Sequence, residues 1–449
     1  MSCTINPNFE LLNKLQEEKE WDLLSQDIHN TFKLQFDREN VPKMFTFNAK
    51  NLDYLESLLI IQADSQIFNE NLLIETLKAI RNSLTNSESQ KYLSNEKFLS
   101  VVRALFNKIE QKDPDNLCFK ILLQLLINLV VQNPDGCKHV FQEFSDLSDL
   151  LLKDICIYEV SALLYNISIY VELNCFNTPV INNIFNLYGK ENKNEYLLFL
   201  IEKLLSYDYF WDFYENLEVS NRILCLHIIR EQQISKNKII CIKKGLDVIT
   251  KLFINSSEII FNTTSQTNDE RAFEISLMLQ ILSHITGEST DLLIHLQNNS
   301  DLLIQAAVVL INIHRLGKTF NNCFTQIQKQ SDVNSEDSSH PAFGFKGDLV
   351  RLIGNMNWKC KKMQDLTREA EIIPVILECC NIDARNPFIM QWSIFAIRNI
   401  CENNVENQKI IGGLSKIGTV SNDVLKKSGI TLHADGSNQV NIVNLEDIK

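Results

Sequence analysis

Apolar residues recur through most of the chain at intervals of three and four positions, with polar residues between them. Three segments show the spacing i, i+3, i+4, i+7 without interruption. They are Leu122, Leu125, Leu126 and Leu129; Val160, Leu163, Leu164 and Ile167; and Leu349, Leu352, Ile353 and Met356. Because this spacing places the apolar side chains on one face of an α-helix, the pattern predicts helices that each bury one face.

A short sequence frame recurs within these predicted helices: two aliphatic residues, any residue, and then Asn. The copies end at Asn82, Asn128, Asn166, Asn312, Asn355 and Asn399, and His227 and His284 take the same position in two further stretches. Intervals of 46, 38 and 44 residues, at 82–128, 128–166 and 355–399, approach the roughly 40–47 of HEAT and armadillo repeats. The interval of 28 between His284 and Asn312 is too short, so we expect one copy there to belong to a different helix of its repeat.

A second polar position follows the frame by eight or nine residues in four copies. It is occupied by Gln90, Cys137, Gln364 and Gln408. Turn-forming residues such as 132–136 and 402–407 fill the interval. Each long helix is therefore predicted to end there, and the next repeat to begin.

Some segments lack the helical spacing. Residues 255–270 and 328–340 are polar and are predicted to be surface loops, and Pro341 directly follows the second. This pattern predicts irregular helical repeats at 1–327, a flexible polar loop at 328–342 and a C-terminal domain at 343–449. The tail from Gly429 carries β-branched residues on both sides of an Asp-Gly pair, which predicts a short β-hairpin.

Composition supports an all-α chain. Only 13 Gly and 8 Pro interrupt 449 residues, so helices can run on, and 45% hydrophobic residues exclude a wholly disordered protein. The predicted fold class is therefore an all-α, armadillo/HEAT-like α-solenoid of stacked repeats, with the hairpin at its end. The net charge of −13 argues against nucleic acid as the main ligand, because binding to phosphates needs a basic face.

Little in the sequence points to a membrane, a metal or catalysis. The amino terminus does not resemble a signal peptide, and the most apolar run, 121–131, is too short to span a bilayer. The 12 cysteines form no CxxC pair and are interpreted as reduced, buried thiols of a cytoplasmic protein. No catalytic or phosphate-binding motif occurs, so we expect no catalytic residues, no metal site and no cofactor.

Residues 343–411 contain long, specific strings: FKGDLVRLIGN, the pair Gln364-Asp365, IPVILECCNIDARNPFI at 373–389 and AIRNICENNVENQ at 396–408. Here the chain resembles the C-terminal domain of the ataxin-10 family. The resemblance implies an armadillo-like fold, a cytoplasmic and perinuclear location, and a role in cytokinesis and, in animals, in neurite growth and neuronal survival. It also implies binding to enzymes such as O-linked N-acetylglucosamine transferase. It supplies no catalytic residues.

Two groups of residues are candidates for binding a partner. The first is the repeated Asn, at Asn82, Asn128, Asn166, Asn355 and Asn399. If these amides line a groove, they are expected to bind an extended peptide; the alternative is that each bonds the backbone of an adjoining turn or repeat. The second is an aromatic and basic cluster, because Trp and Arg are enriched at binding hot spots. It comprises Trp358, Lys361, Lys362 and Arg398, with Lys359 and Trp392 nearby. Trp392 begins an apolar stripe and is interpreted as core.

The leading hypothesis is a non-catalytic scaffold or adaptor that binds other proteins. It is compatible with a homo-oligomer of this chain. An alternative is an armadillo-like regulator of a GTP-binding protein or its subunits. The acidic surface of this chain would then meet a basic face of that partner. A nuclear-transport adaptor ranks last, because four Trp at irregular positions do not form a regular Trp-lined groove.

Overall fold

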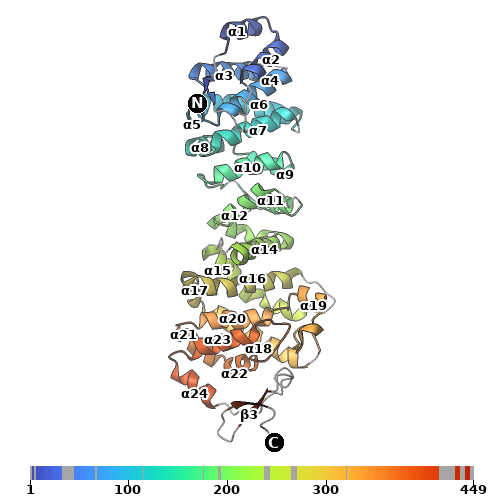
Figure 1. Cartoon of the computed structure of the whole chain (residues 1–449), viewed down its shortest axis with the longest axis vertical. Helices are drawn as coiled ribbons and strands as arrows, with labels where there is room; N and C mark the ends of the chain where they lie inside the picture. Colours follow the sequence, from blue (N-terminus) through green and yellow to red (C-terminus); the bar gives the residue numbers. More distant parts are fainter. Residues whose placement is uncertain are drawn as a thin grey trace. The chain divides into compact units, whose positions relative to one another are not determined.

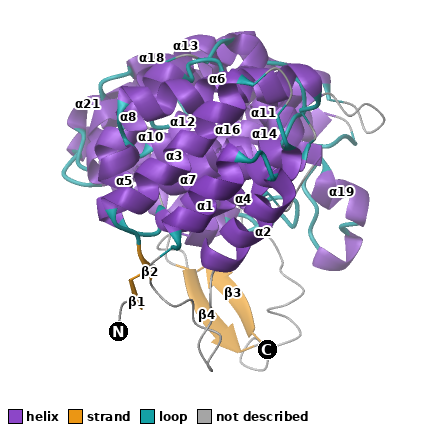
Figure 2. Ribbon diagram, turned by 90° about the horizontal axis from the view of Figure 1, so that it is seen from above, coloured by secondary structure: helices purple, strands orange, loops and turns teal. Residues whose placement is uncertain are grey.

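The computed structural model describes residues 3–4, 7–32, 45–65, 68–114, 116–174, 176–190, 194–236, 243–263, 270–319, 321–413, 430–434 and 440–444. These residues form two compact units. The first comprises 1–255 and 269–281, and the second 256–268 and 282–449. Helices make up almost all of the described chain, as Figure 2 shows.

The first unit is built from helices that follow one another in chain order, drawn from blue to green in Figure 1. Its helices are α1 (Phe9–Glu17), α2 (Trp21–Phe32), α3 (Ala49–Asp64), α4 (Glu70–Ser83), α5 (Ser87–Leu93), α6 (Glu96–Lys112), α7 (Leu117–Val130), α8 (Pro134–Glu143), α9 (Leu147–Leu152), α10 (Ile157–Ser168), α11 (Thr178–Lys190), α12 (Glu195–Leu204), α13 (Asp208–Phe213), the 3-10 helix η1 (Tyr214–Asn216), α14 (Val219–Lys236) and α15 (Lys243–Ser256). Two short parallel strands, β1 (Cys3–Thr4) and β2 (Phe45–Thr46), also belong to it.

The second unit contains the remaining elements, and α16 (Glu270–Glu288) contributes residues to both units. They are η2 (Ser257–Asn262), α17 (Thr290–Gln297), α18 (Ser300–Thr319), η3 (Gln330–Asp332), α19 (Ser335–Ser339), α20 (Phe345–Met356), α21 (Lys361–Glu369), α22 (Ile373–Glu378), α23 (Ile389–Cys401), α24 (Val405–Gly413), β3 (Ile430–Ala434) and β4 (Val440–Asn444). Strands β3 and β4 pair antiparallel, with Ile430 opposite Asn444, which confirms the predicted C-terminal strand pair.

Asparagine side chains begin many of these helices. Asn69 Oδ1 accepts a hydrogen bond from Leu72 N at 2.9 Å, and Asn95 Oδ1 accepts one from Phe98 N at 2.9 Å. The same role is played by Asn8, Asn48, Asn86, Asn116, Asn133, Asn194 and Asn334. Such a cap satisfies a main-chain N–H that has no partner in the helix and stabilises it by about 1 kcal/mol.

Three-helix repeats explain the intervals found in the sequence. In the first unit α5, α6 and α7 pack together, as do α8, α9 and α10; in the second, α21, α22 and α23 do so. The frame Asn closes the third helix of each. These packed helical repeats confirm the predicted all-α, armadillo-like solenoid class. Leu126, on α7, has none of its surface exposed, as expected for a residue at the centre of such a stack.

The short interval near residue 312 also has an explanation. Asn312 lies on α18, which precedes α20 and packs on it, whereas Asn355 ends α20 itself. Asn312 is thus on the second helix of the repeat α17–α18–α20. The expectation that one copy belongs to a different helix is confirmed.

Two predicted loops contain helical turns. Residues 257–262 form η2, and the prediction of a surface loop there is wrong because Ile260 is fully buried. The segment 328–340 contains η3 and α19 and is mostly exposed. The predicted domain boundary at 328–342 stays a prediction. The two compact units are defined by contacts within the chain and do not test it. No helix in the described ranges is both long and apolar enough to cross a membrane.

Candidate partner-binding surface

The frame asparagines connect neighbouring repeats. In three of them the side-chain Nδ2 donates to a main-chain carbonyl of the preceding repeat. The bonds run from Asn128 to Arg81 O at 3.0 Å, from Asn355 to Ser283 O at 3.0 Å and from Asn399 to Gly354 O at 2.9 Å. Each acceptor directly precedes a frame position, namely Asn82, His284 or Asn355. One repeated bond therefore joins the third helices of successive repeats.

A close approach of the backbones makes room for this bond in the second unit. A Cβ added to Gly354 would lie only 3.0 Å from the Cα and Cβ of Ala396. A larger residue would push α20 away from α23 and lengthen the bond from Asn399. The glycine is therefore part of the joint between these two repeats.

The other two frame asparagines bond locally. Asn166 Nδ2 donates to Ala162 O within its own helix at 2.8 Å, and Asn82 Oδ1 accepts from Arg81 at 3.3 Å. Asn355 and Asn399 are buried, and the other three are half-buried. The side-chain donors of Asn128, Asn166, Asn355 and Asn399 are thus engaged within the chain. Binding of a partner by the frame asparagines stays a prediction.

The second recurring position closes the ends of the third helices. Gln90 Nε2 donates to Asn128 O at 2.7 Å, Gln364 Nε2 to Asn399 O at 2.8 Å, and the Cys137 thiol lies 3.7 Å from Asn166 O. Gln297 on α17 bonds the end of α20 in the same way, through Met356 O and Trp358 O. Since the last carbonyls of a helix have no partner inside it, these side chains replace the missing donors.

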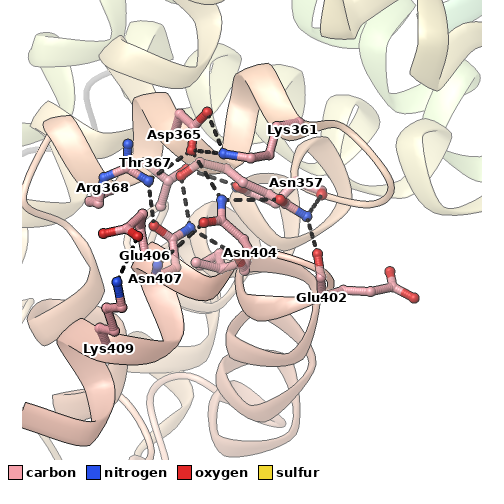
Figure 3. Close-up of polar contacts among 12 residues, drawn as sticks. Asn357, Lys361, Asp365, Thr367, Arg368, Glu402, Asn404, Glu406, Asn407 and Lys409 are labelled. Atoms are coloured by element: carbon pink, nitrogen blue, oxygen red, sulfur yellow. Dashed lines mark hydrogen bonds and ion pairs between the residues drawn. The ribbon is translucent and has the colours of Figure 1, made fainter.

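A polar network joins α21 to α24, and Figure 3 shows its side chains converging. The Asp365 carboxylate accepts from Lys361 at 2.7 Å, from Arg368 at 2.7 Å and from Asn404 at 3.1 Å. The hydrogen bond from Lys361 is the largest of the effects that lower the pKa of Asp365, to about 2. Asp365 is therefore ionised at neutral pH and acts as a fixed acceptor.

Buried amides complete the same network. Asn407 Nδ2 donates to Gln364 O at 3.0 Å and to Ile400 O at 2.9 Å, while its Oδ1 accepts from Arg368 at 2.9 Å. Thr367 donates to Asn357 Oδ1 at 3.0 Å. The sequence motifs around Gln364-Asp365 and at 402–407 are thus explained by the contacts that α21 makes with α23 and α24. Lys361, a predicted binding residue, has its ammonium group in this network.

A pocket of about 200 Å³ lies beside Trp358 in the second unit. It is lined by Thr286, Gly287, Thr290, Leu293, Asn355, Trp358 and Phe395. Trp358 is half-buried, and the ammonium of Lys359 lies 4.5 Å from the centre of its ring. Lys359 itself has a φ of 51°, which turns the chain sharply after α20. Trp358 is therefore held at the end of a helix with part of its ring accessible.

Trp392 occupies a neighbouring position. The guanidinium of Arg351 lies 4.6 Å from its ring centre and also 3.3 Å, through Nη2, from His284 Nδ1. Burial lowers the pKa of Arg351. The stripe predicted to be core is buried at Ala396 and Ile400, whereas Trp392 and Phe395 are only half-buried. Trp392 is thus both packed and partly accessible.

Lys362 and Arg398, two cations of the predicted cluster, lie on α21 and α23. Lys362 and Arg398 are exposed and form no ion pair with any residue whose position is described. Arg398 follows Phe395 by three residues on α23, so the two side chains share a face of that helix. The sequence did not indicate Leu293 or Phe395 as pocket residues, because their contact with Trp358 joins segments distant in the chain.

Another exposed apolar surface lies around the start of α23. Phe388 is 68% exposed and has a φ of 63°, a conformation that is uncommon for a bulky residue. It borders a shallow pocket of about 250 Å³ with Gln328, Gln330 and residues 381–384 and 386–391. Arg385 ties this region to the preceding segment by donating to Asn322 O at 2.6 Å and to Thr325 O at 2.9 Å.

Burial makes several of the described thiols less reactive than a free cysteine. The cysteines with described side chains are free thiols, and burial raises the pKa of Cys137 to about 12 and those of Cys118 and Cys379 to about 11. A nucleophilic cysteine needs a lowered pKa. Among the described residues, no group of three His, Cys, Asp or Glu side chains is arranged to hold a metal ion.

Comparisons with solved structures give matches of low similarity. A chain from a study of the interaction between cadherin and β-catenin is 13% identical, with a TM-score of 0.39 over 87% of this chain and 68% of that chain. A designed armadillo repeat protein is 12% identical, with a TM-score of 0.21 over 77% of this chain and 99% of that chain.

Sequence comparisons are more specific. Residues 345–443 match the family described as the spinocerebellar ataxia type 10 protein domain. Human ataxin-10 is 28% identical over 438 residues, covering 90% of each chain. The ataxin-10 homolog of Dictyostelium discoideum is 42% identical over 114 residues, which is 25% of this chain and 18% of that protein. This chain therefore carries a match to the ataxin-10 domain at its C-terminal end and is similar to human ataxin-10 along 90% of its length.

Proposed function

We propose that this chain is a non-catalytic scaffold that binds other proteins, and that its C-terminal unit does so through the surface around Trp358. We call this surface, formed by Trp358, Phe395, Lys362 and Arg398, the Trp358 surface. The observation that carries the proposal is a half-buried Trp that lines a pocket together with Phe395, which lies on the same helix as the exposed Arg398. Trp and Arg are the residues most often found at the centres of protein interfaces.

The size and charge of this surface favour a protein ligand of a particular kind. A pocket of about 200 Å³ is smaller than the roughly 300–1,000 Å³ of small-molecule sites, so it suits a single anchoring side chain. Lys362 and Arg398 would attract carboxylates in the flanking residues. The expected ligand is therefore a peptide segment with an apolar anchor and acidic neighbours.

The finer statements rest on the family resemblance. We propose a role in cytokinesis and, in animals, in neurite growth and neuronal survival, with a cytoplasmic and perinuclear location. The partners would include O-linked N-acetylglucosamine transferase or G-protein subunits. A nucleotide-exchange assay with the purified chain distinguishes simple binding of a G protein, which leaves the exchange rate unchanged, from the alternative of regulation, which changes it.

The binding proposal is tested by quantitative affinity purification with the full-length chain. Trp358→Ala and Arg398→Glu are compared with Arg315→Glu, a charge reversal of an exposed arginine on α18. We expect both variants at the Trp358 surface to lose the same set of partners by at least about tenfold, equivalent to about 1.4 kcal/mol, while Arg315→Glu retains them. Full retention of every partner by Trp358→Ala and Arg398→Glu would rule out this surface.

A further inference from the structure

Four aromatic side chains form a continuous cluster on α10 and α12 of the first unit. The rings of Tyr158 and Tyr196 lie 5.2 Å apart, and those of Tyr165 and Phe199 lie 5.3 Å apart. Tyr196 also lies 6.3 Å from Tyr165 and 6.2 Å from Phe199, so the two pairs are joined. We call these four residues the tyrosine cluster.

The tyrosine cluster lies outside the core of the two helices. Tyr158 is 55% exposed and Phe199 36% exposed, and the other two are half-buried. The core below them is formed by fully buried aliphatic residues such as Leu163 and Leu200. Because the cluster adds little to that core, its exposed aromatic surface needs another explanation.

The spacing of the cluster fits a polyproline II helix. Tyr158 and Tyr165 are seven residues apart on α10, so their positions are separated by about 10.5 Å along the helix axis. A polyproline II helix repeats every three residues, or about 9.3 Å. Prolines three residues apart would therefore contact the two ring pairs in turn, as prolines do in other aromatic-lined grooves.

The chemistry of the tyrosines supports the same ligand. A polyproline II segment makes no hydrogen bonds within its own backbone, so its carbonyl groups remain available as acceptors. The Tyr158 and Tyr196 hydroxyls share one hydrogen bond, so one of their two protons remains to donate to such a carbonyl. No charged side chain belongs to the cluster, so the proline rings would be buried against apolar surface without desolvating a charge.

Charge at the edge of the cluster defines the flanking residue of the ligand. Glu195 is exposed, directly precedes Tyr196 and forms no ion pair among the described residues. Burial is the largest effect that raises the pKa of the Tyr196 hydroxyl, the neighbouring Tyr158 is the next, and the negative charge of Glu195 adds to both. In contrast, the charge of Glu159 is already paired with Lys120 at 3.4 Å. A basic residue beside the prolines would therefore meet Glu195.

We propose that the tyrosine cluster and Glu195 form a docking site for a proline-rich segment that carries a basic residue. This site is separate from the Trp358 surface, so either proposal can fail while the other holds. Its energy would come from aromatic contacts with the prolines, and the charge pair would set the orientation of the segment.

The test uses the full-length chain and an array of proline-rich peptides, each about twelve residues long and carrying arginine at one end or the other. Every peptide has two matched controls, one with each proline replaced by alanine and one with arginine replaced by glutamate. We expect the proline-rich peptides to bind more strongly than both controls. Equal binding of the alanine controls, or no binding by any peptide, would overturn the proposal.

Variants of the chain locate the site. Tyr158→Ala and Phe199→Ala should each weaken binding of the best peptide by about tenfold, whereas Tyr170→Ala, at an equally accessible tyrosine outside the cluster, should leave it unchanged. Glu195→Lys should reduce the preference for arginine over glutamate. The thermal unfolding of each variant is measured first, so that a loss of binding is compared only among folded proteins. Binding unaffected by Tyr158→Ala and Phe199→Ala would also contradict the assignment.

Discussion

Asparagine has two distinct structural uses in this chain. At helix starts its side-chain oxygen accepts a hydrogen bond from a free main-chain N–H, as Asn69 and Asn95 do. At the ends of third helices its side-chain nitrogen donates to the preceding repeat, as Asn128 and Asn399 do. The amide serves both uses because it carries a donor and an acceptor on a short side chain.

Replacing a buried bridging amide should destabilise the protein. In Asn399→Leu, Gly354 O loses its side-chain donor, and we expect a loss of about 1–3 kcal/mol in the free energy of unfolding. The neighbouring exposed substitution Arg398→Ala should change it by less than about 0.5 kcal/mol. Urea unfolding of the full-length proteins measures both, and equal stability of Asn399→Leu and wild type would show that the bond contributes nothing.

A half-buried histidine, His314, should make stability depend on pH. Burial lowers the pKa of His314, and the nearby Lys346 and Lys318 add to that effect, which the hydrogen bond with Glu378 opposes. The unfolded chain therefore binds a proton at His314 more readily than the folded chain does, so acidification favours unfolding. The stabilising contribution is complete above about pH 6.5 and is lost as the pH falls below that value.

Thermal unfolding between about pH 7.5 and 5.5 checks this dependence. We expect the midpoint temperature of unfolding to decrease as the pH is lowered across that interval. The decrease should be smaller for His314→Gln than for wild type. Some decrease should remain because burial also lowers the pKa of His227. Identical pH profiles for His314→Gln and wild type would contradict the assignment.

The helices depend on a few central side chains. Leu126 is fully buried on α7, which packs between α4 and α10. Leu126→Ala should cost about 2–5 kcal/mol, because it removes apolar contacts and leaves a cavity. Ile304→Ala, at a residue 40% exposed on α18, should cost much less. Calorimetry compares the two, and an unchanged unfolding temperature for Leu126→Ala would contradict the central position of α7.

Arg385 is one of several residues that hold the segment before α20, together with Gln326 and Ile327, which bond residues 382–384. Arg385 bonds Asn322 O and Thr325 O and forms an ion pair with Asp337 at 2.9 Å. Arg385→Ala should therefore release residues 321–340 and speed cleavage there in limited proteolysis. Lys409→Ala, which removes an exposed ion pair on α24, is the control. Equal cleavage rates for the two variants would show that Arg385 does not hold the segment.

The local sequence pattern predicts helices and strands better than it predicts which of them contact one another. Apolar spacing identified the helices around Leu126 and Leu352, and the Asp-Gly pair identified the strands β3 and β4. It missed η2 at 257–262, because the polar residues on both sides outweighed the buried Ile260. The main-chain acceptors of the bridging amides at Asn128, Asn355 and Asn399 lie 45–72 residues away in the sequence, so spacing alone indicated the repeat but not the bond.

At the scale of the whole molecule, the sequence similarity to the ataxin-10 family varies along the chain. The family domain covers 345–443, and the similarity to human ataxin-10 covers 90% of the chain at 28% identity. The sequence alone led to the same family through strings that the structure explains as contacts among α20, α21, α23 and α24. The sequence indicated Trp358 by its residue type, but Leu293, which lines the same pocket, could be identified only from the structure.

Binding at the Trp358 surface can be measured directly in cells. A photo-crosslinking amino acid is placed at position 358 of the full-length chain and, as a control, at position 315 on the exposed face of α18. The account predicts discrete crosslinked protein partners from position 358 and none of the same partners from position 315. An absence of partners at position 358, or the same partners from both positions, would contradict it.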